Sequence, residues 1–446
     1  MLKRLLTPIN FGLKCILSDI TLVANSLVWY YVVLILLLQG IIIKSNFNDF
    51  QVLLICTLHF GSLIVTALAG ASIAKKIEYR RFIIVWMILG ILSSFALLIV
   101  NPSDIVHVSL IVILLGTSLG LGMPKCMGHY ARSIPVESRG QLSGITLFIS
   151  GIGIVAFSIA GISEIIILGI ILAIWRLVGL IIFLLTKVTS SPLEAKEDQS
   201  KYKDIFSQHS FILYLIPWIM FSLINYLVSP VSPTIDVSEL GNLTLIQTGF
   251  MGLFALLGGF LIDSIGRKRI AVTGFILLGL GAAALGISWT MPFLYFNVIM
   301  DGIAWGFLLV LFILTIWGDL SYSESSDKYY AIGVMPFFIS KFLDLTVGKY
   351  IASYLSNSSA LFSFGAFFLF LAVLPLIYAP ETLPEKNIKD RELKNYLEKA
   401  QKIVAKEAQK KQGKKKNQRT EETKEDQKEE NSVEYDEARK LAEKYY

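Results

Sequence analysis

The stretch Gly259-Phe-Leu-Ile-Asp263-Ser-Ile-Gly266-Arg267-Lys268-Arg269 ends one long apolar segment of the chain and begins the next. Gly259 and Gly266 permit close backbone approach and a tight turn. Asp263 lies at the end of one expected helix and near the N-terminus of the next, where a negative charge is favourable. The basic residues suit a membrane surface and can pair with Asp263. The stretch therefore predicts a charged turn between two membrane helices.

The composition around this turn is that of a membrane protein. Of 446 residues, 54% are hydrophobic and 17% are charged, with a mean hydropathy of +0.64. Soluble domains average about 25% charged residues. Residues 381–446 hold 18 Lys and Arg and 16 Asp and Glu, which leaves 22 and 18 for the first 380 residues. That charge density excludes a soluble enzyme or a nucleic-acid-binding domain, and the net charge of +6 belongs to loops and a tail.

Membrane-spanning helices account for most of the chain. A helix needs about 20 apolar residues to cross a bilayer, about twice the length of a barrel strand. Twelve segments meet this length, and we expect an all-α protein with spans at residues 21–43, 50–74, 80–100, 105–129, 141–162, 164–186, 211–231, 242–264, 270–289, 293–317, 330–356 and 360–379.

The orientation follows from the basic residues between the spans. Eighteen Lys and Arg fall in one alternating set of connections, whereas the other set contains only Lys44. We therefore expect both termini to be cytoplasmic.

The spans divide into two halves of similar length. The polar loop 187–210 separates residues 21–186 from residues 211–379, and an offset of 189 places Gly70 on Gly259 and Arg139 on Lys328. Equal halves are typical of membrane transporters. Residues 1–20 are expected to be a cytoplasmic segment. The charged tail, 380–446, is expected to be cytoplasmic and partly helical, because apolar residues recur at helical spacing at Leu393, Leu397, Ala400 and Val404.

The charged turn carries a family resemblance. Gly259, Asp263, Gly266 and the basic residues after them resemble the signature loop of the major facilitator superfamily, with Ser264 where a basic residue is usual. In the first half, Gly70 and Arg80 remain, but Ala74 replaces the aspartate. The resemblance implies two pseudo-symmetric six-helix bundles around a central cavity.

Three further stretches are similar to the sugar-porter branch of this superfamily. They are Pro135-Val-Glu137-Ser-Arg139-Gly140, Asp319-Leu320 followed by Lys328, and Pro380-Glu381-Thr382. The paired glutamines of span seven are absent, since Ile219 and Met220 occupy their positions. This argues against a standard hexose site.

Charged residues at bilayer depth are costly and indicate function. Asp301 lies within span ten, and Lys341 and Asp344 share one face of span eleven. Both spans border the central cavity in the fold that the resemblance implies. The three residues are expected to bind substrate charge or to couple a proton, with a permanent buried ion pair as the alternative.

Polar and aromatic residues complete the expected substrate site. Asn297 and Trp305 lie on the same helix face as Asp301, and the other members are Asn225, Tyr226, Trp29 and His59. Ordinary packing is the alternative for each aromatic ring, and for His59. Arg176 in span six is expected to make a structural contact or to extend toward the cytoplasm.

The charged turn and its counterparts are expected to form a cytoplasmic gate. Its expected members are Gly259, Asp263, Gly266, Arg267, Lys268, Glu137, Arg139, Asp319 and Lys328. Paired charges would hold the halves together in one state and separate in the other.

These features predict a multi-pass plasma-membrane transporter, not an enzyme, with no cofactor or metal and no nucleic-acid partner. We expect a monomer that moves a small polar solute, such as a sugar, by alternating access in the lipid bilayer with a proton as the coupling ion. Two alternatives stay open: a uniporter or exporter of a charged organic solute, and a non-transporting sensor whose tail engages a partner.

Overall fold

The computed structural model describes residues 13–45, 47–73, 77–162, 164–186, 201–228, 237–321, 326–348, 350 and 358–383. Within these ranges every regular element is a helix. The chain divides into a unit Met1–Leu383 and a unit Pro384–Tyr446. The second unit lies outside the described residues, and so does the tail helix expected there.

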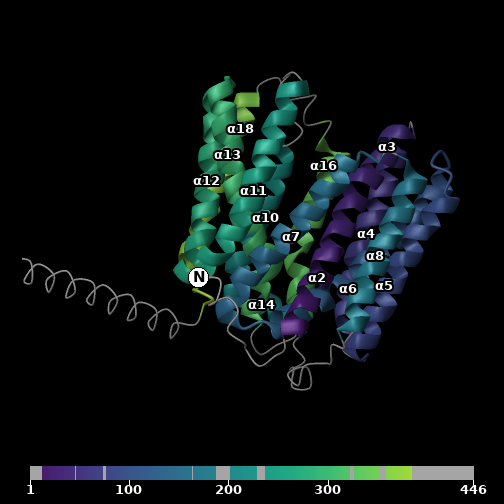
Figure 1. Ribbon diagram of the computed structural model, residues 1–446. Coiled ribbons are helices and arrows are strands. Elements are labelled where there is room, and N and C mark those ends of the chain that lie inside the picture. Colours follow the sequence, from purple (N-terminus) through teal and green to yellow (C-terminus); the bar gives the residue numbers. More distant parts are fainter. Residues whose placement is uncertain are drawn as a thin grey trace, which may run out of the picture. The chain divides into compact units, whose positions relative to one another are not determined.

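The first half contains the purple to blue helices of Figure 1. In chain order they are α2 (Leu13–Tyr31), the π-helical η1 (Val32–Leu38), α3 (Gln39–Lys44), α4 (Asp49–Ile73), α5 (Tyr79–Phe95), η3 (Ala96–Ile99), α6 (Ile105–Ser133), η4 (Val136–Ser138), α7 (Arg139–Ala160) and α8 (Ile165–Leu185).

The short helix α9 (Tyr202–Ser207) follows the central loop. The second half then contains α10 (His209–Val228), α11 (Val237–Ile265), α12 (Arg267–Ile287), α13 (Met291–Leu309), the π-helical η6 (Val310–Thr315), α14 (Ile316–Leu320), α15 (Ser326–Gly333), α16 (Met335–Thr346), α18 (Ser358–Leu371) and α19 (Val373–Tyr378).

Ten helices among the described residues are long and apolar enough to cross a membrane, and they match ten of the twelve expected spans. The expected seventh span corresponds to α10, whose described apolar part, His209–Ile224, is shorter. The expected eleventh span is divided into α15 and α16. The break lies before Pro336, which occupies the first turn of α16, where its missing N–H costs nothing. The first span begins earlier than expected, because α2 starts at Leu13.

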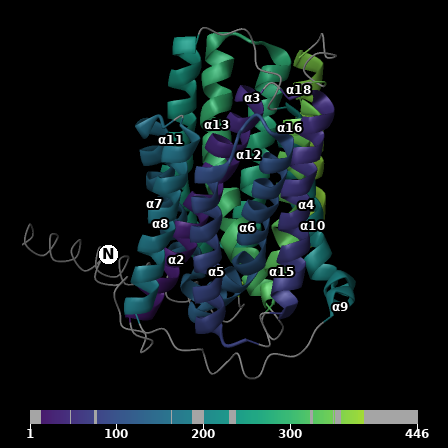
Figure 2. The same cartoon turned by 90° about the vertical axis from the view of Figure 1, so that its right-hand side faces the viewer.

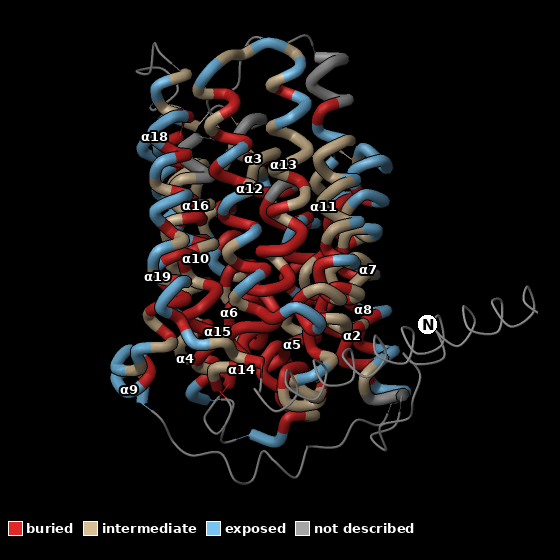
Figure 3. Tube along the Cα trace, turned by 90° about the vertical axis from the view of Figure 1, so that its left-hand side faces the viewer, coloured by how far each residue is buried: buried red, intermediate tan, exposed pale blue. Residues whose placement is uncertain are grey.

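Equivalent pairs of helices pack together in the two halves. In the first half α4 packs on α6 and α5 packs on α8; in the second half α11 packs on α13 and α12 packs on α18. Figure 2 shows the arrangement of these helices, and Figure 3 shows exposed residues on the outer faces and buried residues between the helices. The exposed faces carry large apolar side chains such as Ile159 and Leu185, as expected for surfaces that face lipid.

Contacts between the halves also come in two equivalent sets. Helix α7 of the first half packs on α11 and η6 of the second, and α15 and α16 of the second half pack on α4 and α6 of the first. The polar residues of the expected gate lie where these elements begin and end.

Candidate functional site

The carboxylate of Asp263 joins the two halves. At the end of α11, it accepts hydrogen bonds from the backbone N–H groups of Gly140 and Gln141, at 3.0 and 2.8 Å. These groups belong to the first turn of α7, whose N–H groups lack partners within their own helix. Asp263 is fully buried. A side chain of one half therefore caps a helix of the other.

Asp319 is the second carboxylate of this contact. It lies on α14 and binds Arg139 of α7 through Oδ1 and the Nε of Arg267 through Oδ2, the latter at 2.8 Å. Arg267 also approaches Asp263, with 3.2 Å between Nη2 and Oδ1. The four residues Arg139, Asp263, Arg267 and Asp319, named here the Asp319 cluster, balance two cations against two anions.

Glycines bring the two backbones together next to this cluster. A Cβ on Gly259 would lie 2.5 Å from the carbonyl oxygen of Gly140, and a Cβ on Gly144 would lie 2.6 Å from that of Ala255. Only glycine fits such an approach without a shift of the helices. The glycines of the signature turn are therefore steric requirements of the contact between α7 and α11.

A second set of charges joins the halves at α15. Asp327 lies 3.3 Å from the Nζ of Lys125 and 3.1 Å from Nη1 of Arg132, both on α6. Gly128, between the two cations, faces Asp327 so closely that any Cβ would overlap its carboxylate. Lys125, Arg132 and Asp327 are named here the Asp327 cluster. None of the three was among the expected gate residues.

The remaining expected gate residues surround these clusters. Glu381 accepts hydrogen bonds from the backbone N–H groups of Arg267 and Lys268, at 2.9 and 3.2 Å, and so caps α12. Gly266, with a φ of +120°, faces the Glu381 carboxylate and adopts a conformation that favours glycine. Lys268 donates to the carbonyl oxygen of Ile377 at 2.6 Å. Hence the Pro-Glu-Thr turn is fixed to the signature turn.

Lys328 and Glu137 are members of neither cluster. The Nζ of Lys328 lies over the ring of Tyr202 on α9, 5.0 Å from its centroid. The Tyr202 hydroxyl donates to the Leu68 carbonyl oxygen at 2.7 Å, and burial raises the pKa of this phenol. Glu137 is exposed on η4. The central-loop helix thus contacts both halves.

The structure gives the expected substrate-site charges separate partners. Asp301 on α13 accepts a hydrogen bond from the side-chain amide of Gln247 on α11. Lys341 pairs with Asp344, three residues later on α16, and their side chains are 14% and 15% exposed. These contacts do not join Asp301 to Lys341.

The other expected substrate-site residues are dispersed. Trp305 packs edge-on against Phe221 of α10, with centroids 4.8 Å apart, and lies within hydrogen-bonding reach of Asp301. Asn297 faces Gly281 of α12. The side chains of Asn225 and Tyr226 lie outside the described residues.

Trp29 and His59 lie within the first half. The indole N–H of Trp29 donates to Ser94 at 3.0 Å, and its ring faces Arg176, whose Cζ lies 5.1 Å from the ring centroid. His59 is buried between α4 and α6, with Nδ1 3.1 Å from the Val112 carbonyl oxygen. The packing alternative fits both residues.

Arg176 has the structural role that the sequence offered as one alternative. It is fully buried, donates to Ser26 at 2.8 Å and to Asn25 at 3.3 Å, and lies over the ring of Trp86 at 4.6 Å. Its guanidinium is held within the helices of the first half.

A buried acid–histidine pair was missed by the sequence analysis. Asp19 on α2 lies 3.4 Å from Nδ1 of His129 on α6, and both side chains are 2% exposed. Neither Asp19 oxygen accepts a hydrogen bond. The His129 ring stacks on Tyr79, with centroids 3.7 Å apart. Asp19 had been assigned to the cytoplasmic segment 1–20, although it lies in the second turn of a buried helix.

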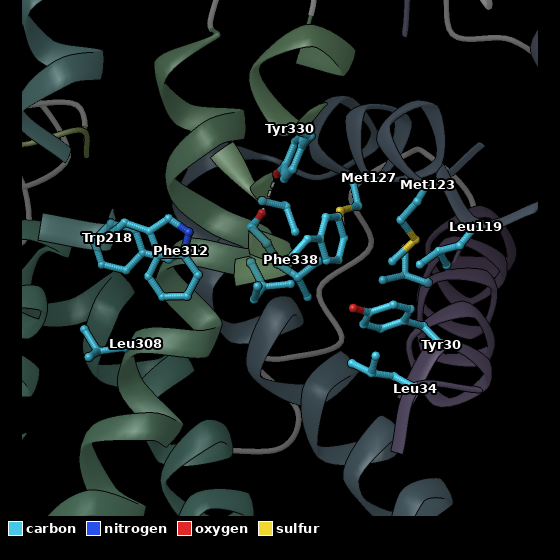
Figure 4. Close-up of a cluster of buried hydrophobic side chains, with 14 of the residues drawn as sticks. Tyr30, Leu34, Leu119, Met123, Met127, Trp218, Leu308, Phe312, Tyr330 and Phe338 are labelled. Atoms are coloured by element: carbon cyan, nitrogen blue, oxygen red, sulfur yellow. Dashed lines mark hydrogen bonds between the residues drawn. The ribbon is translucent and has the colours of Figure 1, made fainter. Parts of the chain in front are cut away.

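Aromatic rings from the two halves also meet between α2 and α16. The rings of Tyr30 and Phe338 meet edge to face at 5.4 Å, one from each half. Figure 4 shows these rings beside Met123 and Met127 of α6.

Within the described part of the chain, no group of three or more His, Cys, Asp and Glu residues could hold a metal ion.

Comparison with known proteins shows which family and which relative this chain resembles. Residues 211–416 match the family model of the Major Facilitator Superfamily. A segment of 151 residues, 32% of the chain, is 31% identical to the 3-(3-hydroxy-phenyl)propionate transporter of Escherichia coli strain K12. The chain spans about a third, 34%, of that relative's length.

Two solved structures have the same fold. The proton:xylose symporter XylE, bound to 6-bromo-6-deoxy-D-glucose, aligns with a TM-score of 0.64 at 14% identity, over 82% of this chain and 96% of XylE. The human organic anion transporter MFSD10 aligns with a TM-score of 0.66 at 12% identity, over 81% of this chain and 99% of MFSD10.

Proposed function

Because the chain belongs to the major facilitator superfamily, we propose that it is a secondary active transporter that moves a small polar solute by alternating access. The proposal places it as a monomer in the plasma membrane, with both termini in the cytoplasm, twelve spans and a proton as the coupling ion.

The observation that carries this proposal is the pair of charge clusters between the halves. Both the Asp319 cluster and the Asp327 cluster join residues of one half to residues of the other through side-chain ion pairs. Buried ion pairs contribute little net stability over an apolar contact, but they fix one arrangement. That property suits a gate that must open and close.

The glycines of α7 and α11 support the same view. Gly151 and Gly252 each lie seven residues, about 10 Å, from the close contact of Gly144 with Gly259, on the same helix faces. A Cβ on Gly151 or Gly252 would meet no atom within 4 Å. The two helices thus touch at the charged end and are farther apart beyond it. This matches a state in which the gate is closed.

Two sites are proposed to carry the coupling proton. One is Asp301, next to Gln247 and Trp305. The other is the Asp19–His129 pair, because a carboxylate that is buried without hydrogen bonds is costly when ionised unless a cation pairs with it. Addition or loss of a proton at either site changes a buried charge.

A charged organic solute is the second candidate for the substrate. Lys341 offers a cation on α16, three residues after Phe338, and in this proposal Asp344 releases it to a substrate carboxylate. An aromatic organic acid would also agree with the substrate in the name of the Escherichia coli relative.

The test is uptake by proteoliposomes with and without a pH gradient, for sugars and for aromatic acids. Proton coupling predicts uptake above equilibrium only with the gradient. Asp19→Asn and Asp301→Asn would each be tested for loss of the gradient-driven uptake, while exchange of the solute across the membrane is retained. Lys341→Met should abolish binding of an acid but not of a neutral sugar. If no solute of either class moves in any condition, the transporter proposal fails and a sensor is favoured.

A further inference from the structure

The tenth span contains a π-helical segment that is not explained by its composition. Helix α13 ends at Leu309, η6 runs over Val310–Thr315, and α14 continues from Ile316. Irregular turns in helices usually arise at Pro or Gly, and η6 contains neither. π-Helical turns are rare and occur frequently at functional sites.

Three side chains hold the carbonyl groups of η6. Thr315 Oγ1 donates to the carbonyl oxygen of Val310 at 2.7 Å, and Trp317 Nε1 donates to that of Phe312 at 2.6 Å. Each bond reaches five residues back, which is the spacing of a π turn. Tyr330 of α15 donates through its hydroxyl to the Leu314 carbonyl oxygen at 2.5 Å.

The packing around η6 fixes these donors. Gly333 faces the ring of Trp317 so closely that a Cβ would overlap it, and a Cβ on Gly318 would lie 2.8 Å from the Tyr330 hydroxyl. On the other side, the ring of Phe312 stacks on Trp218, with centroids 4.9 Å apart. Figure 4 shows Phe312 against Trp218, with Tyr330 on the adjoining helix. The π register is therefore held from several directions.

The segment lies between the groups that the proposed function requires to communicate. Asp301 precedes it on α13, and Asp319 follows it on α14, where it binds Arg139 of the first half. Tyr330 lies three residues after Asp327 on α15. Helix α7, which begins at Arg139, packs directly on η6. One short segment is thus in contact with the elements that carry both charge clusters.

A change of register here would act on the gate directly. Each residue of an α-helix turns the chain by about 100° and advances it by about 1.5 Å. If η6 adopts α-helical hydrogen bonding, the chain beyond it is displaced by about one residue relative to α13. Asp319 then no longer faces Arg139, and the Leu314 carbonyl leaves Tyr330.

We propose that η6 is a register switch that links the substrate-site half of span ten to the gate. Thr315, Trp317 and Tyr330 are positioning residues that hold the π register in which Asp319 meets Arg139. This inference rests on the proposed alternating access but makes a claim about conformation that requires no knowledge of the solute.

The experiment measures distances between spin labels in the full-length protein in lipid nanodiscs. One pair, at Arg81 and Arg269, reports the end where the charge clusters lie; the other, at the exposed Ile159 and Leu245, reports the far ends of α7 and α11. The three native cysteines are replaced by alanine. The variants are Thr315→Val and Tyr330→Phe, each of which removes one hydroxyl donor.

Two further variants serve as controls. Thr315→Ser restores the hydroxyl. Thr346→Val removes a buried hydroxyl that donates four residues back, to the Phe342 carbonyl oxygen at 2.8 Å, in an ordinary turn of α16. We expect Thr315→Val and Tyr330→Phe to increase the population with a longer Arg81–Arg269 distance and a shorter Ile159–Leu245 distance. The increase should be about two- to tenfold, the effect of one net hydrogen bond on an equilibrium.

The wild-type distribution is expected for Thr315→Ser and for Thr346→Val. Unchanged distances in a folded Tyr330→Phe protein would overturn the switch, and so would an equal shift in Thr346→Val or a failure of Thr315→Ser to restore the distribution. If Thr315→Val does not fold, Tyr330→Phe decides the question. Since no solute is added, failure here is distinct from failure of the transport assay.

Discussion

The carboxylate of Asp263 in the second half accepts a hydrogen bond from the backbone N–H of Gly140 in the first half, at 3.0 Å. Helix capping by an acidic side chain is ordinary within one domain. Here the cap crosses between two bundles, so α7 keeps its first turn satisfied only while the bundles touch at this end. Separation of the halves must expose these N–H groups to water or to another partner.

Asp263→Asn tests this cap. The substitution keeps one oxygen acceptor but removes the charge that faces Arg267, so a buried cation loses a partner. We expect a lower unfolding midpoint in detergent, a loss of up to about 3–5 kcal/mol, and reduced transport with normal membrane insertion. Asp104→Asn is the matched control, because Asp104 caps α6 within one half, through Val106 N–H at 2.9 Å. Wild-type uptake by Asp263→Asn would remove its gate role.

A double-mutant cycle tests whether Asp327 acts with Lys125. The two lie 3.3 Å apart in buried surroundings, so Asp327→Asn removes a charge that Lys125 faces, and Lys125→Met removes one of the two cations that face Asp327, the other being Arg132. The double variant should be less destabilised than the sum of the single effects, with a coupling energy of about 0.5–3 kcal/mol from denaturation in detergent. Additive effects would mean that the pair does not contribute to closure.

Hydropathy and length were sufficient to predict most of the helices, because a bilayer demands long apolar segments whatever the tertiary structure. The exceptions have local causes. Span eleven is interrupted before Pro336, and α2 begins at Leu13 although basic residues in this region, such as Lys14, suggested a surface segment. The π register of η6 had no signal in the sequence, because its carbonyls are held by side chains such as Tyr330 on another helix.

The charged contacts between the halves were largely predictable, whereas the partners of the residues expected at the substrate site were not. Asp263, Arg267 and Asp319 follow short motifs that fix their places at helix ends, where the fold brings them together. Residues in mid-helix have several possible neighbours. Lys341 pairs with Asp344 because an acid three residues away is always within reach, whereas Asp19 and His129 meet only through the packing of α2 on α6.

Gly144→Ala should disturb the contact between the halves. The added Cβ would lie 2.6 Å from the Ala255 carbonyl oxygen and 3.1 Å from the Gly259 Cα. Overpacking of this kind costs about 1–3 kcal/mol, so the closed contact should become less populated. Reactivity of a cysteine placed at Gln141, a half-buried position at the same contact, toward a water-soluble thiol reagent should therefore rise. Gly151→Ala, where a Cβ meets no atom within 4 Å, should leave that reactivity unchanged. Equal reactivity in both variants would contradict the steric account.

Gly90→Ala tests whether Arg176 organises the first half. A Cβ at Gly90 would lie 2.6 Å from Arg176 Nε, and the guanidinium cannot retreat, because Trp29 and Trp86 cover its faces. The substitution should lower the free energy of unfolding by about 1–3 kcal/mol through overpacking, and the thermal midpoint should fall with it. Gly61→Ala, on α4, has no atom within 4 Å of the new Cβ and should instead gain up to about 1 kcal/mol from reduced backbone entropy. If the free energy of unfolding falls for Gly90→Ala and rises for Gly61→Ala, the cost at Gly90 comes from Arg176. A rise for both variants would mean that Arg176 is packed more loosely than these contacts describe.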